Sequence, residues 1–204
     1  MPFYRVGLTG NVASGKSSVL EHFTQWGAAA IDHDLLAREA IAPGSPGLEQ
    51  VRSRFGPSVF AKDGSLDRAA LRRRVMNDPA EREALNAIVH PEVARLASRR
   101  EAELRQGGAG IVVHDIPLLF EVLDPATYDA VVLVDAPEAV RRQRLMAGRG
   151  LTAADADALI AAQMPSAAKR SRSQFVIENG GDRASLEHQA RAVWRKLQER
   201  AGIV

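Results

Sequence analysis

The sequence of 204 residues contains no cysteine. This absence excludes a disulfide framework, a thiolate zinc site and a cysteine nucleophile. No stretch of about 18 apolar residues occurs that would suggest a membrane span. The first residues also lack the basic region and apolar stretch of a secretory signal. We therefore expect a cytoplasmic protein with no membrane partner.

A large excess of charge of one sign is also missing, because the formal net charge is only +2. Proteins that bind nucleic acids usually concentrate basic residues on one face, so we expect no nucleic-acid partner. The arginine clusters at 72–74, 99–100 and 141–142 are interpreted as solvated helix faces, with contact between one of them and an anionic substrate as the alternative. Nothing in the sequence indicates an obligate protein partner.

Lysine is scarce, since only four of the 27 basic residues are lysines. One of the four is Lys16. Arginine does not replace lysine well where a compact ammonium group must fit among phosphate oxygens. The retention of lysine at this position therefore favours a phosphate-binding role.

Hydrophobic residues make up 46% of the chain, which is enough to build the core of one compact domain. Short apolar runs at 5–9, 28–32, 111–114, 130–134 and 175–177 predict strands, and helix-compatible segments separate them. Strands that alternate with helices predict an α/β fold with a parallel sheet covered on both faces.

Two segments do not fit simple strand–helix alternation. Residues 48–105 are mostly helical and too numerous for one crossover helix, so we interpret them as an insertion where a second substrate docks. A helix is expected from Pro137 to about residue 147, followed by a hinge-like break at 148–150. Thr152 and Asp155 then resemble a capping box that begins another helix.

A glycine-containing loop at 10–17 carries the clearest chemical signal. The segment fits the pattern G-x-x-x-x-G-K-[ST] at every fixed position, between a predicted strand and a predicted helix. Backbone amides of such a loop and the helix N-terminus attract phosphate. Lys16 is expected to reach the β- and γ-phosphates of a nucleotide, and the Ser17 hydroxyl to bind Mg²⁺. The cofactor expectation is therefore Mg²⁺ with ATP as co-substrate.

Two acids follow the second predicted strand. Asp32 and Asp34 would point to the same side of an extended segment, at the strand ends where ligands bind in open α/β sheets. One of them could accept a proton from an acceptor hydroxyl. In the alternative interpretation, Asp34 only caps a helix that begins at Leu35. No N-K-x-D segment for guanine recognition is present, so a small kinase is favoured.

Several motifs in the same order resemble those of the dephospho-CoA kinase family. They are the phosphate loop, Asp32-His33-Asp34, His90-Pro91, Pro117-Leu118-Leu119-Phe120-Glu121, Arg144-Leu145-Met146, Gln163, and Lys169 followed by residues 176–180. The resemblance extends from about residue 5 to residue 181. The D-x-D, H-P and P-L-L-F-E elements in this order are much more specific than the phosphate loop alone.

The resemblance implies a P-loop NTPase fold in three parts: a core at about 1–42, 107–147 and 173–204, a helical CoA-binding insertion at about 43–106, and a lid at about 148–172. The implied reaction transfers the γ-phosphate of ATP to the ribose 3′-hydroxyl of dephospho-CoA, the last step of coenzyme A synthesis. By position, Asp34 would be the base with Asp32 supporting it. Arg144 would lie over the transferring phosphate, and Lys16 completes the expected catalytic set.

Further site residues follow from the same reasoning. The expected ATP-binding residues are Asn11, Val12, Ala13, Ser14, Gly15, Lys16, Ser17, Ser18 and Asn179. The expected substrate-binding residues are Thr9, Asp32, His90 and Leu118. Asp115 and Asp135 each end an apolar strand, as a Walker-B acid would, and Asp115 is the candidate for contact with Mg²⁺ through water.

Some positions depart from the family pattern. The loop interior is Asn11-Val12-Ala13 where the family usually has glycine, isoleucine and glycine, and His33 replaces the usual alanine. Gly148 stands where a second lid arginine is usual. Two other functions stay open: a kinase of the same fold for a nucleotide, nucleoside or sugar acid, and a non-catalytic ATP-binding regulator.

Overall fold

The computed structural model describes residues 3–203, and these fall into two compact units. Residues 3–31 and 104–203 form the first unit, and residues 32–103 form the second. The second unit begins about ten residues before the expected insertion boundary at residue 43, because α2 (His33–Ala40) packs on α3 (Pro46–Phe55).

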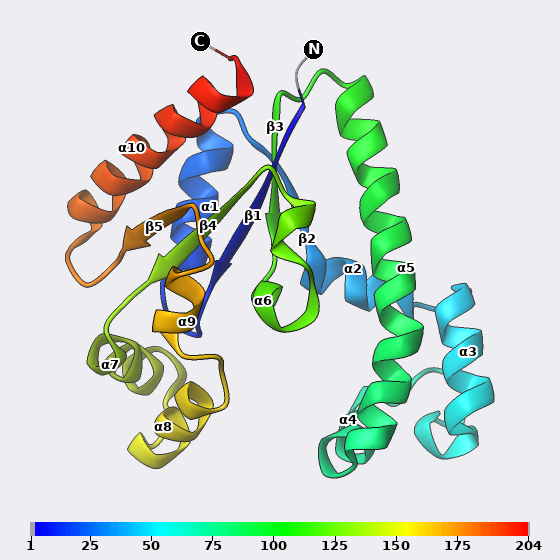
Figure 1. Ribbon diagram of the computed structural model, residues 1–204. Helices are drawn as coiled ribbons and strands as arrows, with labels where there is room; N and C mark the ends of the chain where they lie inside the picture. Colours follow the sequence, from blue (N-terminus) through cyan, green and yellow to red (C-terminus); the bar gives the residue numbers. More distant parts are fainter. Residues whose placement is uncertain (1–2, 204) are drawn as a thin grey trace. The chain divides into compact units, whose positions relative to one another are not determined.

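The first unit contains a five-stranded sheet (Figure 1). Its strands are β1 (Tyr4–Gly10), β2 (Ala29–Asp32), β3 (Ile111–Asp115), β4 (Ala130–Asp135) and β5 (Phe175–Glu178). Their order is β2-β3-β1-β4-β5, and β1 pairs in parallel with both β3 and β4. The strand that carries the phosphate loop is therefore central, as the predicted fold class requires.

Helices cover both faces of this sheet. The helices and 3₁₀ turn of the first unit are α1 (Lys16–Gln25), α6 (Leu119–Val122), η2 (Pro125–Thr127), α7 (Glu138–Arg149), α8 (Ala153–Ala161), α9 (Ser166–Arg170) and α10 (Arg183–Ala201). On one face, α1 and α10 contact each other through Phe23 and Trp194, whose ring centroids are 5.5 Å apart. On the other face, Val131 packs with Leu119 and Tyr128. Burial on both faces explains why β3 and β4 are nearly continuous apolar runs.

The second unit is helical, with a core of its own. Its elements are α2, α3, η1 (Pro57–Val59), α4 (Arg68–Asn77) and most of α5 (Pro79–Gln106). Val51, Phe55 and Leu71 are buried together in this core. A single antiparallel bridge joins Phe60 to Leu66 at the expected interruption around residues 63–64. The long α5 contains Pro91 without ending there.

The predicted break at residues 148–150 is wrong for its first two positions. Helix α7 includes Gly148 and Arg149, and it ends at Gly150, which has a left-handed backbone with φ of 63°. An interior glycine costs a helix only about 1 kcal/mol relative to alanine, and buried Leu145 holds this helix in place. The next helix begins as expected, because the Thr152 side chain accepts the Asp155 amide.

No helix in the part of the chain from residue 3 to residue 203 combines the length and apolar character needed to cross a bilayer.

Candidate active site

The phosphate loop runs from the end of β1 at Gly10 to the start of α1 at Lys16. A Cβ at Gly10 would lie 2.5 Å from Ser14 Oγ and 2.6 Å from the Val134 carbonyl oxygen, so no side chain fits there. Gly15 has φ of 91°, a left-handed conformation that favours glycine. Both fixed glycines of the motif are therefore demanded by the local backbone geometry.

Ala13 shares this left-handed conformation, with φ of 59°, although it carries a side chain. A non-glycine residue in this region costs roughly 1–2 kcal/mol. The loop therefore holds a strained backbone at one position where the resembled family usually has glycine. Such strain persists only where surrounding contacts fix the backbone.

Several amides of the loop are available for a ligand. Within residues 3–203, the backbone N–H groups of Ala13, Gly15, Lys16 and Ser17 donate to no acceptor of the protein. By contrast, the Ser14 amide is used in a turn, donating to the Asn11 carbonyl oxygen at 3.0 Å. Unused amides next to a helix N-terminus form a binding site for an anion. The loop can hold the phosphates of a nucleotide.

Lys16 and Asp115 form an ion pair beside this loop. The side chains are only 13% and 14% exposed, respectively. Strands β1 and β3 are neighbours, with Leu8 in register with Asp115, so the end of β3 lies next to the phosphate loop. Asp115 thus lies beside the loop, and its contact with Mg²⁺ through water stays a prediction. An ammonium group and a carboxylate at this position can serve a phosphate and a divalent cation, respectively.

Asp135, the other acid at a strand end, is engaged by hydrogen bonds and an ion pair within the protein. Its carboxylate accepts hydrogen bonds from the Ala136 amide and the Ser166 hydroxyl, both at 2.9 Å. It also forms an ion pair with Arg170 at 2.7 Å. The hydrogen bonds that Arg170 donates to Asp135 and Glu178 raise the pKa of Arg170 above its usual value, so this cation stays charged.

A pocket of about 270 Å³ adjoins the phosphate loop and includes Gly15, Ser18, Arg144 and Asn179 in its lining. The Arg144 guanidinium donates to the Asn179 carbonyl at 3.0 Å and to the Ala13 carbonyl at 3.3 Å. The Asn179 side chain donates to the Ser14 carbonyl at 2.7 Å. Arg144 and Asn179 thus contact the loop backbone, and a planar guanidinium in the pocket can stack on an aromatic ring.

The acidic pair lies in the second unit, and its local geometry differs from expectation. Asp32 is the N-cap of α2, where its carboxylate accepts the Leu35 amide at 3.0 Å. Asp34 is exposed in the first turn of that helix. The expectation of one extended segment was wrong because α2 begins at His33. The capping role that we considered for Asp34 belongs to Asp32.

His33 lies between these two acids and is partly buried. Burial lowers the pKa of His33 from 6.5 to about 4, although the nearby Asp32 carboxylate acts in the opposite direction. The imidazole is therefore neutral at neutral pH. A neutral ring at this position adds no positive charge beside the flanking carboxylates.

The remaining predicted positions have different environments. Thr9 is fully buried and its hydroxyl donates to the Pro117 carbonyl at 3.2 Å, and its assignment to substrate binding stays a prediction. Ser17 and Ser18 are exposed at the start of α1. Leu118 is 43% exposed just before α6, and His90 is exposed within α5. Exposure leaves these four side chains accessible to a ligand.

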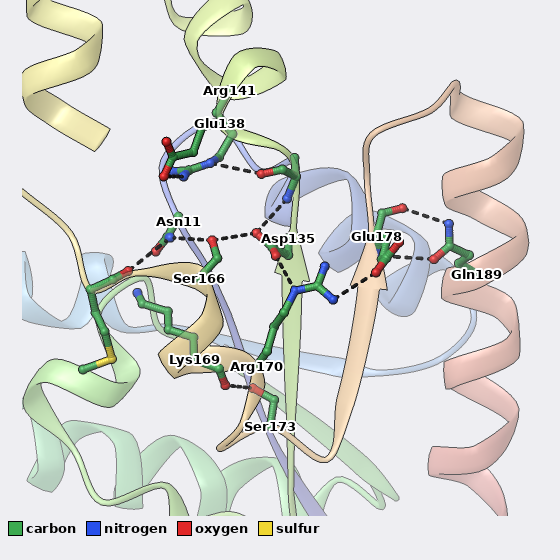
Figure 2. Close-up of polar contacts among 12 residues, drawn as sticks. Asn11, Asp135, Glu138, Arg141, Ser166, Lys169, Arg170, Ser173, Glu178 and Gln189 are labelled. Atoms are coloured by element: carbon green, nitrogen blue, oxygen red, sulfur yellow. Dashed lines mark hydrogen bonds and ion pairs between the residues drawn. The ribbon is translucent and has the colours of Figure 1, made fainter. Parts of the chain in front are cut away.

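Sequence reasoning missed a set of contacts between the loop and residues 163–170, of which Figure 2 shows those of Asn11. The Gln163 side chain accepts the Val12 amide at 2.7 Å. The Asn11 side chain donates to the Met164 carbonyl at 3.3 Å and to the Ser166 hydroxyl at 3.2 Å. Gln163 was noticed as part of a family pattern, but its partner lies 151 residues away. No local signal in the sequence predicts such a contact.

Lys169 and Glu121 form a second contact of this kind. Lys169 is fully buried, and its ammonium group lies 2.8 Å from the Glu121 carboxylate of α6. This ion pair ties residue 169 to the P-L-L-F-E motif.

Mg²⁺ is the metal that this type of site implies, and the residues present fit it. Among residues 3–203, no group of three or more His, Asp or Glu could hold a metal ion. Mg²⁺ commonly uses only one or two protein oxygens together with water and phosphate oxygens. The exposed Ser17 hydroxyl and the Asp115 carboxylate are oxygen donors of this kind at the phosphate loop.

A parallel sheet centred on a phosphate loop, with a lysine and a strand-end acid beside it, is the arrangement of a P-loop nucleotide-binding protein. Comparisons with known proteins are more specific. Residues 4–185 match the dephospho-CoA kinase family. The dephospho-CoA kinase of Moorella thermoacetica is 44% identical over 194 residues, covering 95% of this chain and 92% of that protein. The dephospho-CoA kinase of Anaeromyxobacter dehalogenans is 47% identical, covering 91% and 88% of the two chains. The chain belongs to the dephospho-CoA kinase family of ATP-dependent kinases.

Solved structures agree with the fold. The structure of TT1252 from Thermus thermophilus has a TM-score of 0.84 and 38% sequence identity, covering 97% of this chain and 99% of that one. The dephospho-CoA kinase from Campylobacter jejuni has a TM-score of 0.73 at 22% identity, covering 97% and 98%. At that identity the second comparison supports the fold alone. The predicted P-loop fold class is confirmed.

Proposed function

We propose that this protein transfers the γ-phosphate of ATP to the ribose 3′-hydroxyl of dephospho-CoA, giving coenzyme A and ADP. The observation that carries the proposal is the phosphate loop, with unused amides and Lys16 beside it, in a chain of this family. The loop supports ATP as the donor, and the family supports dephospho-CoA as the acceptor. Because the reaction uses ATP, we place the enzyme in the cytoplasm.

In this proposal, the donor binds along the loop. The amides of Ala13, Gly15 and Lys16 hold the phosphates, and the Lys16 ammonium exchanges Asp115 for phosphate oxygens. The adenine ring stacks on the Arg144 guanidinium in the adjoining pocket. The guanidinium of Arg144 contacts the Asn179 and Ala13 carbonyls, and its expected place over the transferring phosphate stays a prediction beside this stacking role.

Ser17 and Asp115 would hold Mg²⁺, which supplies positive charge to the phosphates when bound. Asp34 accepts the proton from the 3′-hydroxyl as the acceptor oxygen bonds to the γ-phosphorus and the bond to ADP breaks. Asp32 keeps the first turn of α2 in place through its cap, and thereby positions Asp34. The helical unit that contains His90 binds the acceptor, and Leu118 offers it an apolar contact. The segment 148–172 closes over ATP to exclude water.

The test is an ADP-release assay with purified protein, ATP and Mg²⁺, in which candidate acceptors are compared at equal concentration. Dephospho-CoA should support ADP release well above the rates with AMP, uridine or gluconate. A higher rate with one of those three would assign the chain to another small-molecule kinase. ADP release that no acceptor stimulates would instead favour a non-catalytic ATP-binding regulator.

A further inference from the structure

Asn11 and Val12 of the phosphate loop are held by side chains and backbone from the segment that follows α8. Val12 donates its amide to the Gln163 side chain at 2.7 Å, so this amide is not among those left for phosphate. Asn11 is 4% exposed and its side-chain amide donates to both Met164 and Ser166. Its backbone carbonyl meanwhile closes the turn with Ser14. Asn11 and Val12 are thus held in place, and the residues whose amides are available for phosphate follow them in the loop.

A chain of hydrogen bonds connects these residues to the sheet (Figure 2). Ser166 accepts from Asn11 and donates to Asp135 at 2.9 Å. Asp135 is 6% exposed and ends β4, the strand paired with β1, and Arg170 holds its second carboxylate oxygen at 2.7 Å. Arg170 in turn contacts Glu178 at the end of β5. Residues 163–170, at the end of the segment proposed to close over ATP, are therefore anchored on two strand ends, from which they can position the loop.

We propose that Gln163 and Asn11 are positioning residues that hold the phosphate loop in its nucleotide-binding conformation before ATP arrives. The proposal rests on the proposed function only in requiring that ATP binds at this loop. The strained backbone at Ala13 supplies the reason for such support, since a left-handed alanine favours other conformations when it is not restrained. If the restrained loop is populated only part of the time, the apparent affinity for ATP falls by that fraction.

The central variant is Gln163→Met, which keeps the length of the side chain and removes the acceptor oxygen for Val12. Losing the partner of a partly buried amide should weaken ATP binding about tenfold. The KM for ATP should rise accordingly, while the KM for dephospho-CoA stays within about twofold. The matched control is Gln25→Met at the exposed end of α1, where the glutamine makes only a 3.4 Å contact with Glu21. This control should leave ATP binding unchanged.

The experiment combines calorimetric titration of ATP, without any acceptor, with hydrogen exchange of the Val12 amide in the nucleotide-free protein. We expect the Val12 amide to be protected in the wild type and to exchange at least about tenfold faster in Gln163→Met. Ser166→Ala, which breaks the link from Asn11 to Asp135 and leaves the Val12 contact, should weaken ATP binding about threefold. This second variant decides the matter if Gln163→Met does not fold.

Wild-type exchange at Val12 as fast as in an unstructured peptide would overturn the proposal. So would an ATP affinity in Gln163→Met within twofold of the wild type. A wild-type protein that binds ATP but does not phosphorylate dephospho-CoA would remove the proposed function and leave this inference intact. Failure of the wild type to bind ATP would remove both.

Discussion

Lys16 at the start of α1 forms an ion pair with Asp115 at the end of β3, although 99 residues separate them in the sequence. The parallel pairing of β1 and β3 brings the two groups together. The pair keeps both charges beside the phosphate loop. Each charge has a separate partner in the proposed complex, namely phosphate for Lys16 and Mg²⁺ for Asp115.

The first prediction therefore concerns the two members of this pair. Lys16→Ala should lower kcat by at least about 10²-fold, since it removes charge stabilisation from the transferring phosphate. Asp115→Asn leaves the lysine in place and should instead raise the Mg²⁺ concentration needed for half-maximal rate. Initial rates measured across a Mg²⁺ series distinguish the two effects. An Asp115→Asn enzyme with the wild-type Mg²⁺ requirement would exclude this carboxylate from the metal site.

The second prediction separates the two acids of the D-x-D segment. Asp34→Asn should lower kcat by about 10²-fold or more because the proposed base is lost. Asp32→Asn should retain the melting temperature within a few degrees, because asparagine is an equally good N-cap for α2. Its kcat should fall much less than that of Asp34→Asn. Steady-state rates and thermal melts of both variants provide the test, and near-normal turnover by Asp34→Asn would remove it from the base role.

A third prediction concerns Arg144. Because its guanidinium lines the pocket beside Gly15, Arg144→Ala should raise the KM for ATP by about tenfold or more. Arg144→Lys should recover little of this loss, since an ammonium group cannot stack as a planar guanidinium does. Competition by ADP and by pyrophosphate measures the effect directly. The inhibition constant should change for ADP and stay nearly constant for pyrophosphate if the adenine contact is the one removed.

The fourth prediction is a pH dependence of stability that arises from His33. Its pKa is about 4 in the folded protein and about 6.5 when unfolded, so between these values the unfolded chain binds more protons. Stability is therefore lost as the pH falls from 6.5 towards 4. At pH 5.5 the titration of His33 lowers the free energy of unfolding by about 1 kcal/mol. His33→Ala should remove it.

Urea unfolding of the wild type and His33→Ala at pH 7.5 and pH 5.5 measures this difference. The wild type should lose about 1 kcal/mol more than the variant over that interval. Equal losses in the two proteins would contradict the low pKa of His33. Other groups titrate in both proteins and cancel in the comparison.

The fold and the phosphate loop could be predicted from the sequence because their signals are local. The apolar runs of β3 and β4 and the cap formed by Thr152 with Asp155 involve residues adjacent or three apart. The fixed residues Gly10 and Gly15 likewise respond to backbone geometry within the loop itself.

The contacts that support the loop could not be predicted in this way. The partner of Val12 is Gln163, and the partner of Asn11 is Ser166, each more than 150 residues along the chain. These contacts depend on the tertiary structure, which residue propensities and hydrophobic periodicity do not predict. The start of α2 was also predicted wrongly, and the reason is local. Strand β2 ends at Asp32 and α2 begins at His33, so no glycine, proline or turn segment marks the boundary in the sequence.

The most direct test of the central claim is the chemical identity of the product formed from ATP and dephospho-CoA. Purified protein with Mg²⁺ should convert dephospho-CoA into a species that co-elutes with coenzyme A and has its mass. Phosphorus NMR should locate the new phosphate on the ribose 3′-oxygen, one product should form per ADP released, and Lys16→Ala should abolish the conversion. ADP release without coenzyme A formation, or a phosphate at another position, would contradict the account.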